Sequence, residues 1–183
     1  MRTSVSRSPH ASRPPSTQRG AAKWAVIALV AVAALVGSWF VFKPAAPTPE
    51  ASFVTLQGEK FDLESLRGKV VLVNFWATSC VTCVQEMPML VDTYNKYAPR
   101  GYETIAVAMS YDPPNYVLNF AETRQLPFKV TLDPMGEIAR SFGDIRLTPT
   151  TFLLDKQGRV IKRYLGEPPH QEFHATIEAA LNS

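Results

Sequence analysis

The chain has 183 residues, of which 46% are apolar and 19% are charged, so it can bury the core of one ordinary domain and is not a wholly disordered protein. Two cysteines are too few for a small disulfide-stapled scaffold. The net charge of +3 divides unevenly: residues 1–43 contain 6 basic residues and no acid, whereas residues 44–183 contain 13 basic and 16 acidic residues. Because a nucleic-acid-binding domain carries its positive charge on the folded surface, this distribution argues against that class.

Three segments precede the expected domain. Residues 1–23 are rich in Ser, Pro and Arg without apolar periodicity, which predicts a disordered basic tail. Residues 24–42 carry no charge, and a helix of that length spans roughly 28 Å, so we expect a transmembrane helix. Prolines follow it where a signal peptidase would cut, which favours an uncleaved anchor over a removed signal peptide. Residues 43–51 are expected to be an extended Pro-rich linker, and residues 52–183 the folded domain.

Basic residues are more numerous before the apolar segment than directly after it. Five precede it, and Lys43 alone lies close behind. Because an excess of positive charge stays in the cytoplasm, we expect a cytoplasmic N-terminus and a domain on the periplasmic, or extracytoplasmic, side of the inner membrane.

Strands alternate with helices along the expected domain. Two short stretches joined by a glycine turn predict an N-terminal β-hairpin over residues 52–63. The apolar run of residues 70–77 predicts a central strand covered on both faces, and helical spacing of apolar residues predicts a helix over residues 81–97. Further strands are expected near residues 104–109, 128–132, 151–154 and 159–165, and further helices near residues 115–124, 135–142 and 170–181. The last two strands flank a hairpin turn, so the predicted class is α/β with a mixed sheet.

The two cysteines form the motif Cys80-Val81-Thr82-Cys83, directly after the expected central strand. At a helix N-terminus, free backbone N–H groups and the helix dipole stabilise a thiolate. We therefore expect Cys80 to be the exposed nucleophile and Cys83, one turn later, to be buried but able to close a disulfide with it. Such a pair attacks a disulfide through the first sulfur and releases the mixed disulfide through the second.

Other interpretations of Cys80 and Cys83 are weaker but stay open. A zinc site needs a second ligand pair at workable spacing, and a loop of two residues gives an inert disulfide little effect on the unfolded chain. A copper-handling module could use both sulfurs as soft ligands, and a thiol peroxidase could use one as its nucleophile. His170 and His174 lack the glutamate that a zinc-protease motif places directly after its first histidine, so no metal site is expected there.

Glu86 lies three residues after Cys83, on the same side of the expected helix. A partly buried carboxylate there could relay a proton to or from Cys83. The alternative is a first-turn acid that the helix dipole stabilises.

The segment Phe75-Trp76-Ala77-Thr78-Ser79-Cys80-Val81-Thr82-Cys83 resembles the active site of membrane-anchored thioredoxin-like proteins of the TlpA/ResA type. Glu86-Met87-Pro88 and Arg146-Leu147-Thr148-Pro149-Thr150 also match this family in order and spacing. The resemblance implies a thioredoxin-like fold and a periplasmic thiol-disulfide oxidoreductase that usually acts as a reductant of protein disulfides. In several relatives the work is cytochrome c maturation, with electrons from a membrane thiol carrier of the DsbD/CcdA kind.

The resemblance also assigns roles to individual residues. It implies catalytic roles for Cys80, Cys83 and Glu86, and substrate-binding roles for Trp76, Thr148 and Pro149, with a cis Thr148–Pro149 bond. It implies no cofactor beyond the redox-active Cys80–Cys83 disulfide. The sequence departs from the family at Ser79, usually Trp, and at the dipeptide between the cysteines, where many relatives have a proline. The direction of electron flow, the client proteins and the oligomeric state do not follow from the sequence.

Overall fold

The computed structural model describes residues 49–183, which belong to one compact unit. The predicted tail (1–23), the predicted membrane segment (24–42) and most of the predicted linker (43–51) lie outside the described residues. Within residues 49–183, no helix combines the length and the apolar character that a membrane crossing requires.

The described part of the chain alternates strands and helices, as the sequence predicted. The strands are β1 (Ser52–Val54), β2 (Lys60–Asp62), β3 (Val70–Trp76), β4 (Tyr102–Ala108), β5 (Lys129–Leu132), β6 (Thr150–Leu154) and β7 (Val160–Leu165). The helices are α2 (Val81–Tyr97), α3 (Pro114–Thr123), α4 (Glu137–Ser141) and α5 (His170–Leu181), with short 3-10 helices η1 (Leu63–Leu66) and η2 (Ala98–Arg100). The predicted α/β class is confirmed.

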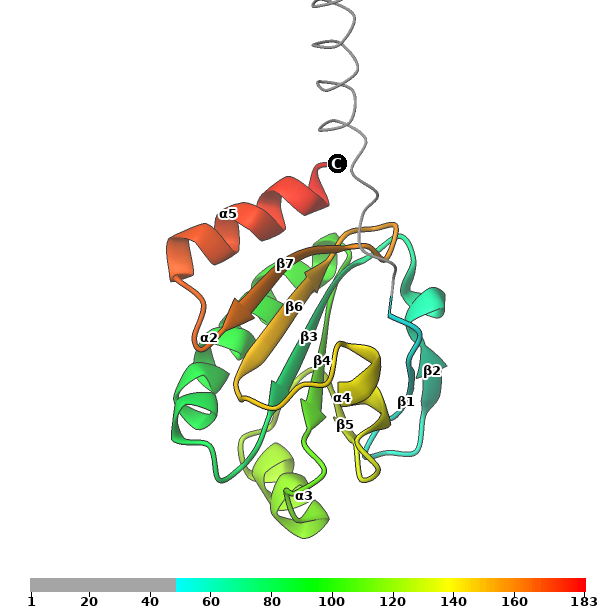
Figure 1. The fold of residues 1–183 in the computed structure, drawn as a ribbon. Coiled ribbons are helices and arrows are strands. Elements are labelled where there is room, and N and C mark those ends of the chain that lie inside the picture. The colour runs from blue at the N-terminus through cyan, green and yellow to red at the C-terminus, as the bar shows by residue number, and fades with distance from the viewer. Residues whose placement is uncertain (1–48) are drawn as a thin grey trace, which may run out of the picture. The chain divides into compact units, whose positions relative to one another are not determined.

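Five strands form a mixed sheet in the order β5-β4-β3-β6-β7, with β3 in the centre (Figure 1). Strands β3, β4 and β5 are parallel, whereas β6 and β7 run antiparallel to their neighbours. Every residue of β3 is buried, as its apolar run predicted, because helices and loops cover both faces of the sheet. Since β6 runs antiparallel to β3, with Phe75 paired to Thr150, the carboxyl end of β3 and the beginning of β6 lie at the same end of the sheet.

The alternation of side chains along β3 divides the core into two clusters. Leu72 and Trp76 face the cluster that contains buried residues of α2, α3 and α5. Val71, Val73 and Phe75 face the other cluster, which contains buried residues of β1, η1 and α4. Central strand β3 is therefore fixed from both sides, and its carboxyl end is a rigid base for the loop that follows.

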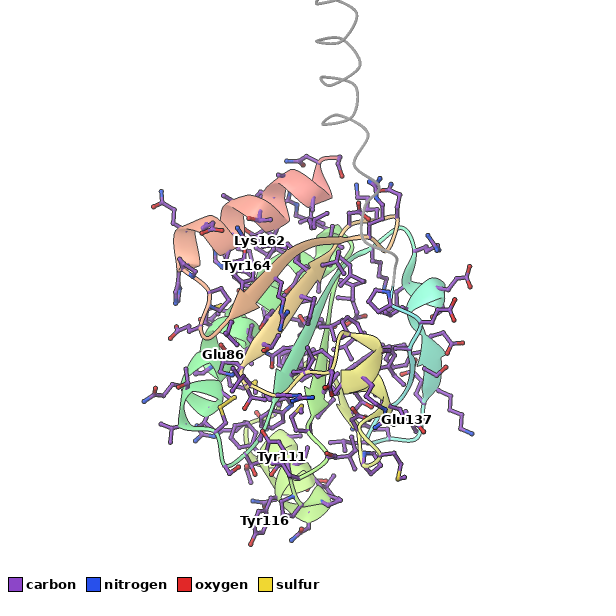
Figure 2. The ribbon with its side chains drawn as sticks, viewed as in Figure 1. Glu86, Tyr111, Tyr116, Glu137, Lys162 and Tyr164 are labelled. Carbon is purple, nitrogen blue, oxygen red and sulfur yellow. A yellow bond between two sulfur atoms is a disulfide. The ribbon has the colours of Figure 1, made fainter. Side chains whose placement is uncertain are left out.

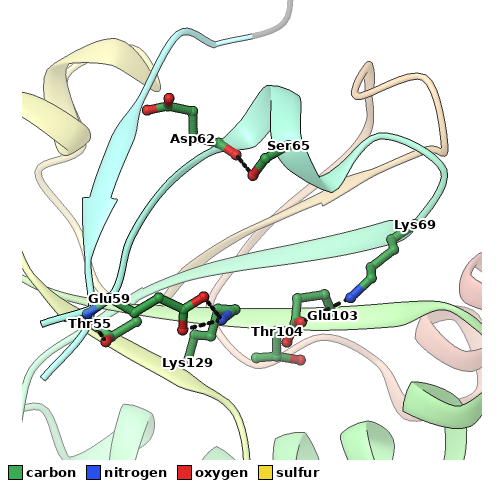
Figure 3. A network of polar contacts seen from close by, with 8 residues as sticks. All are labelled: Thr55, Glu59, Asp62, Ser65, Lys69, Glu103, Thr104 and Lys129. Carbon is green, nitrogen blue, oxygen red and sulfur yellow. Dashed lines mark hydrogen bonds and ion pairs between the residues drawn. The ribbon is translucent and has the colours of Figure 1, made fainter. Parts of the chain in front are cut away.

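The short strands β1 and β2 form a separate antiparallel pair, in the place of the predicted hairpin. The chain beyond β1 continues along β5: Thr55 forms a bridge with Thr131, and the Leu56 N–H donates to the Val130 carbonyl at 3.0 Å. In Figure 3 the Lys129 ammonium reaches both carboxylate oxygens of Glu59, at 2.8 and 2.9 Å. The N-terminal segment thus covers the outer edge of β5.

Helix α4 is shorter than the predicted helix over residues 135–142. Gly136 precedes it with φ of 66°, a left-handed conformation that cannot belong to a right-handed helix. The Asp133 carboxylate accepts the free N–H groups of Ile138 and Ala139, at 3.2 and 2.8 Å. The helix therefore begins at Glu137, two residues later than apolar spacing suggested.

Candidate active site

Cys80 ends the loop after β3 and is the N-cap residue of α2. Its backbone is extended, with φ of −88° and ψ of 106°, and its Sγ accepts a hydrogen bond from the Cys83 N–H at 3.2 Å. An N-cap side chain normally offers an oxygen to the unpaired N–H groups of the first helical turn, and here sulfur takes that place. After reduction, the same N–H and the helix dipole stabilise a thiolate at this position.

The two sulfurs are joined in a disulfide and differ in exposure. Their Cα atoms lie 5.2 Å apart. Cys80 is partly exposed, whereas Cys83 is fully buried in the cluster beneath α2. The predicted difference in burial is confirmed, so a partner's disulfide can approach one sulfur and not the other.

A buried carboxylate holds the loop in front of Cys80. The N–H and the hydroxyl of Thr78 both donate to Asp112, at 2.6 and 2.5 Å, and Asp112 is only 5% exposed. Asp112 belongs to the loop after β4, where the Met109 N–H also donates to the Trp76 carbonyl at 3.0 Å. The connection between β4 and α3 therefore positions the segment that delivers the cysteine.

The Thr148–Pro149 peptide bond is cis, as the resemblance implied. Pro149 is buried and directly precedes β6, so it lies at the end of the sheet where β3 ends. The Thr148 hydroxyl is 3.3 Å from the hydroxyl of Tyr111, whose ring is 58% exposed. The loop before β6 and the loop after β4 thus meet at this end of the sheet, and Figure 2 labels Tyr111 there.

Glu86 is fully buried on the side of α2 that faces the sheet (Figure 2). Its Oε1 accepts a hydrogen bond from Asn74 Nδ2 at 2.8 Å, and its Oε2 is buried without a partner. Burial raises the pKa of Glu86 to about 7, while the bond from Asn74 lowers the pKa and the negative charge of Glu167 raises it. Glu86 therefore exchanges its proton near neutral pH, which suits a general acid or base.

The alternative reading of Glu86, as a first-turn acid that the helix dipole stabilises, is wrong. Helix α2 begins at Val81, so Glu86 lies beyond its first turn. The dipole would lower the pKa of an acid, whereas burial raises that of Glu86.

The expected contact between Trp76 and a substrate is corrected by the structure. The Trp76 side chain is fully buried and packs against Phe120 of α3, with ring centroids 5.1 Å apart. Trp76 lies on the same face of β3 as Leu72, so its side chain points into the core beneath α2. Trp76 supports the loop from below and is not part of the exposed surface.

Two polar residues of the site were missed at the level of sequence. Asn74 lies inside the apolar run of residues 70–77, and Asp112 lies between an expected strand and an expected helix. The available signals were an amide in an otherwise apolar strand and an acid in the loop after the neighbouring strand.

A cysteine pair that begins a helix after the central strand, with a cis-proline at the same end of the sheet, defines a thioredoxin-like thiol-disulfide oxidoreductase. Its chemistry is the formation and cleavage of disulfides. In residues 49–183, no three side chains of His, Cys, Asp or Glu gather as a metal site would require.

Comparison with known proteins agrees with this class. Residues 43–181 match the Redoxin family. The thiol-disulfide oxidoreductase ResA of Bacillus thuringiensis is 39% identical over 130 residues, which cover 71% of this chain and 74% of the relative. ResA of Geobacillus thermodenitrificans is 33% identical over 162 residues, which cover 84% of this chain and 92% of the relative. A thioredoxin-family thiol:disulfide interchange protein from Chlorobium tepidum has a TM-score of 0.68 at 31% identity, covering 75% of this chain and 97% of that one.

The chain therefore belongs to the Redoxin family. Within it, the chain is a TlpA/ResA-like thiol-disulfide oxidoreductase with a thioredoxin-like fold.

Proposed function

We propose that this protein reduces disulfide bonds of exported proteins on the outer side of the cytoplasmic membrane. The observation that carries the proposal is the unequal exposure of the two sulfurs at the start of α2, with Cys80 accessible and Cys83 enclosed. This arrangement gives each sulfur a different step. Cys80 attacks the client, and Cys83 releases it.

The reaction transfers two electrons to the client. The Cys80 thiolate attacks one sulfur of the client disulfide, the client's other sulfur leaves as a thiolate, and a mixed disulfide forms. Cys83 then loses its proton and attacks Sγ of Cys80. The bond between Cys80 and the client breaks, the second client sulfur leaves as a thiolate that takes up a proton, and the Cys80–Cys83 disulfide is formed.

The surface around Cys80 suits an extended, partly apolar client segment. Three exposed apolar residues lie at the end of the sheet where β3 ends, in loops or at a helix start: Val81 (71% exposed), Tyr111 (58%) and Leu147 (62%). The Pro149 carbonyl accepts the Gly166 N–H at 2.9 Å, whereas Thr148 takes no part in the backbone hydrogen bonds of the described loops. In this proposal the free backbone of Thr148 pairs with the client beside the sulfur.

Location and electron supply are further parts of the proposal. The uncharged segment 24–42, preceded by basic residues, supports an inner-membrane anchor with the domain outside. Because each client reduction leaves the disulfide form, a donor of electrons is required, and a membrane thiol carrier of the DsbD/CcdA kind meets this need. Apocytochrome c is the client class that the family resemblance suggests.

The direction of the reaction is tested by equilibrium redox titration of the full-length protein against glutathione. A reduction potential below about −220 mV supports the reductant. A potential near about −120 mV would contradict it, because the protein would then be an oxidant.

Client and location are tested with the two native cysteines. Cys83→Ala should hold clients on Cys80 as mixed disulfides that dithiothreitol releases, and the double variant Cys80→Ala/Cys83→Ala is the control. After mild reduction, a membrane-impermeant maleimide should label Cys80 in intact spheroplasts. Labelling that requires lysis would refute the proposed location.

A further inference from the structure

Asn74 is an amide in the middle of β3, whose seven residues are all buried. Its register partner across the sheet is Thr151 of β6. Nδ2 of Asn74 donates to Glu86 Oε1 at 2.8 Å and to Thr151 Oγ1 at 2.9 Å. A single amide therefore joins the central strand, the strand after the cis-proline and the buried acid of α2.

These two bonds hold the amide nitrogen of Asn74 in place. An amide nitrogen has two N–H groups, and both are used when Glu86 and Thr151 accept. When Glu86 is ionised, the reversed amide would bring its carbonyl oxygen against the carboxylate, which repels it. The Thr151 hydroxyl can donate or accept, so it holds the amide without choosing its orientation, and Oε2 of Glu86 stays buried without a partner.

We infer that Asn74, held in place by Thr151, is a positioning residue for the release of the client: it ties Oε1 of Glu86 to the central strand and leaves Oε2 to take the proton of Cys83. The inference rests on the proposed function, because it concerns the step in which Cys83 attacks the mixed disulfide.

The step balances as follows. The proton of the Cys83 thiol passes to Oε2 of the Glu86 carboxylate. The Cys83 thiolate attacks Sγ of Cys80, the bond between Cys80 and the client breaks, and the client leaves as a thiolate. The carboxyl then gives its proton to solvent or to the departing thiolate. Asn74 exchanges no proton, since it acts through Glu86 alone.

Few charged groups besides the bond from Asn74 act on the pKa of Glu86. Among the described residues, the charged side chain that acts on Glu86 from another element is Glu167, on the turn between β7 and α5. On α2 itself, Cys83 lies three residues before Glu86 and is buried like it. Because the bond from Asn74 stabilises the carboxylate, its removal raises the pKa of Glu86 and moves the pH range in which this base is available upward.

The test uses the reduced full-length protein and 5,5′-dithiobis(2-nitrobenzoic acid) in stopped flow. Attack by Cys80 releases one thionitrobenzoate, and attack by Cys83 on the mixed disulfide releases a second, so the two steps give separate absorbance phases. We expect Asn74→Ala to move the pH midpoint of the second phase upward by roughly one unit. Thr151→Val keeps the side-chain volume and should move the midpoint in the same direction by less, which also covers an Asn74→Ala protein that does not fold.

Two controls separate positioning from general damage. Thr104→Val alters another buried threonine, whose hydroxyl has no partner, and should leave the midpoint unchanged. In a Glu86→Gln background, Asn74→Ala should have no further effect on the second phase, because the base is gone.

The results discriminate between the two levels of the proposal. An unmoved midpoint in Asn74→Ala and Thr151→Val, or an equal slowing with and without Glu86, overturns the role of Asn74 while a normal first phase leaves the proposed function standing. Absence of the first phase in the wild-type protein overturns both.

Discussion

The stability of the folded protein should fall as the pH rises through the range in which Glu86 ionises. Glu86 is fully buried, and burial raises its pKa from 4.5 to about 7, against the opposing bond from Asn74. The folded state therefore holds this proton more tightly than the unfolded state. The pKa of Glu86 differs by about 2.5 units between the folded and the unfolded state (7 − 4.5), so ionisation of Glu86 lowers the free energy of unfolding by about 3 kcal/mol. This loss of stability is absent below about pH 4.5 and fully developed above about pH 7.

Urea unfolding of the oxidised protein measures this cost. Glu86→Gln is neutral at every pH and keeps an oxygen that can accept from Asn74. Between pH 4.5 and pH 8, we expect the free energy of unfolding of the Gln variant to rise relative to wild type by about 3 kcal/mol. Glu122→Gln, a change at an exposed acid of α3, is the control and should show no such trend. If the difference between wild type and Glu86→Gln stays constant over this range, the buried carboxyl does not titrate as argued.

Three other changes test separate parts of the structure. Asp112→Ala removes the acceptor of both Thr78 bonds, so it should lower the unfolding free energy by about 2 kcal/mol and slow the first thionitrobenzoate phase; unchanged kinetics would show that the loop does not need this support. Trp76→Ala empties a fully buried site and should cost about 3–5 kcal/mol by urea unfolding, and a near-neutral result would contradict its core position. Burial raises the pKa of Asp155, but hydrogen bonds from Arg159 outweigh it and lower the pKa overall; Arg159→Ala should therefore destabilise the protein more at pH 6 than at pH 3, and an equal loss would refute the ion pair's contribution.

The order of elements could be predicted from the sequence because the strongest patterns are local. The apolar run of β3 and the helical spacing of α2 each persist over several residues, and both elements begin where predicted. The boundaries of α4 were less predictable, since they depend on the backbone of Gly136 and on a cap from Asp133. Such features depend on φ and on side-chain placement more than on apolar spacing.

The site could be predicted only in its local part. Cys80 and Cys83 are close in sequence and on one helix start, so their relation follows from spacing. The bond of Asp112 to Thr78 joins residues 34 apart, and that of Asn74 to Thr151 joins residues 77 apart. Such partners depend on strand order and register, which sequence patterns do not contain. Trp76 shows the reverse error, because a residue that the family resemblance implied to bind substrate lies buried in the core.

The segment from β1 to Leu56 affects whether the sheet can pair with strands of unfolded proteins. A protein that opens disulfides handles polypeptides that expose unpaired strand edges and associate readily with any bare edge they meet. One margin of this sheet is closed by the Thr55–Thr131 bridge, and the opposite margin, β7, carries the charges of Lys162 and Arg163. With one margin paired and the other charged, contact with a client can be confined to the sulfur and its surrounding loops.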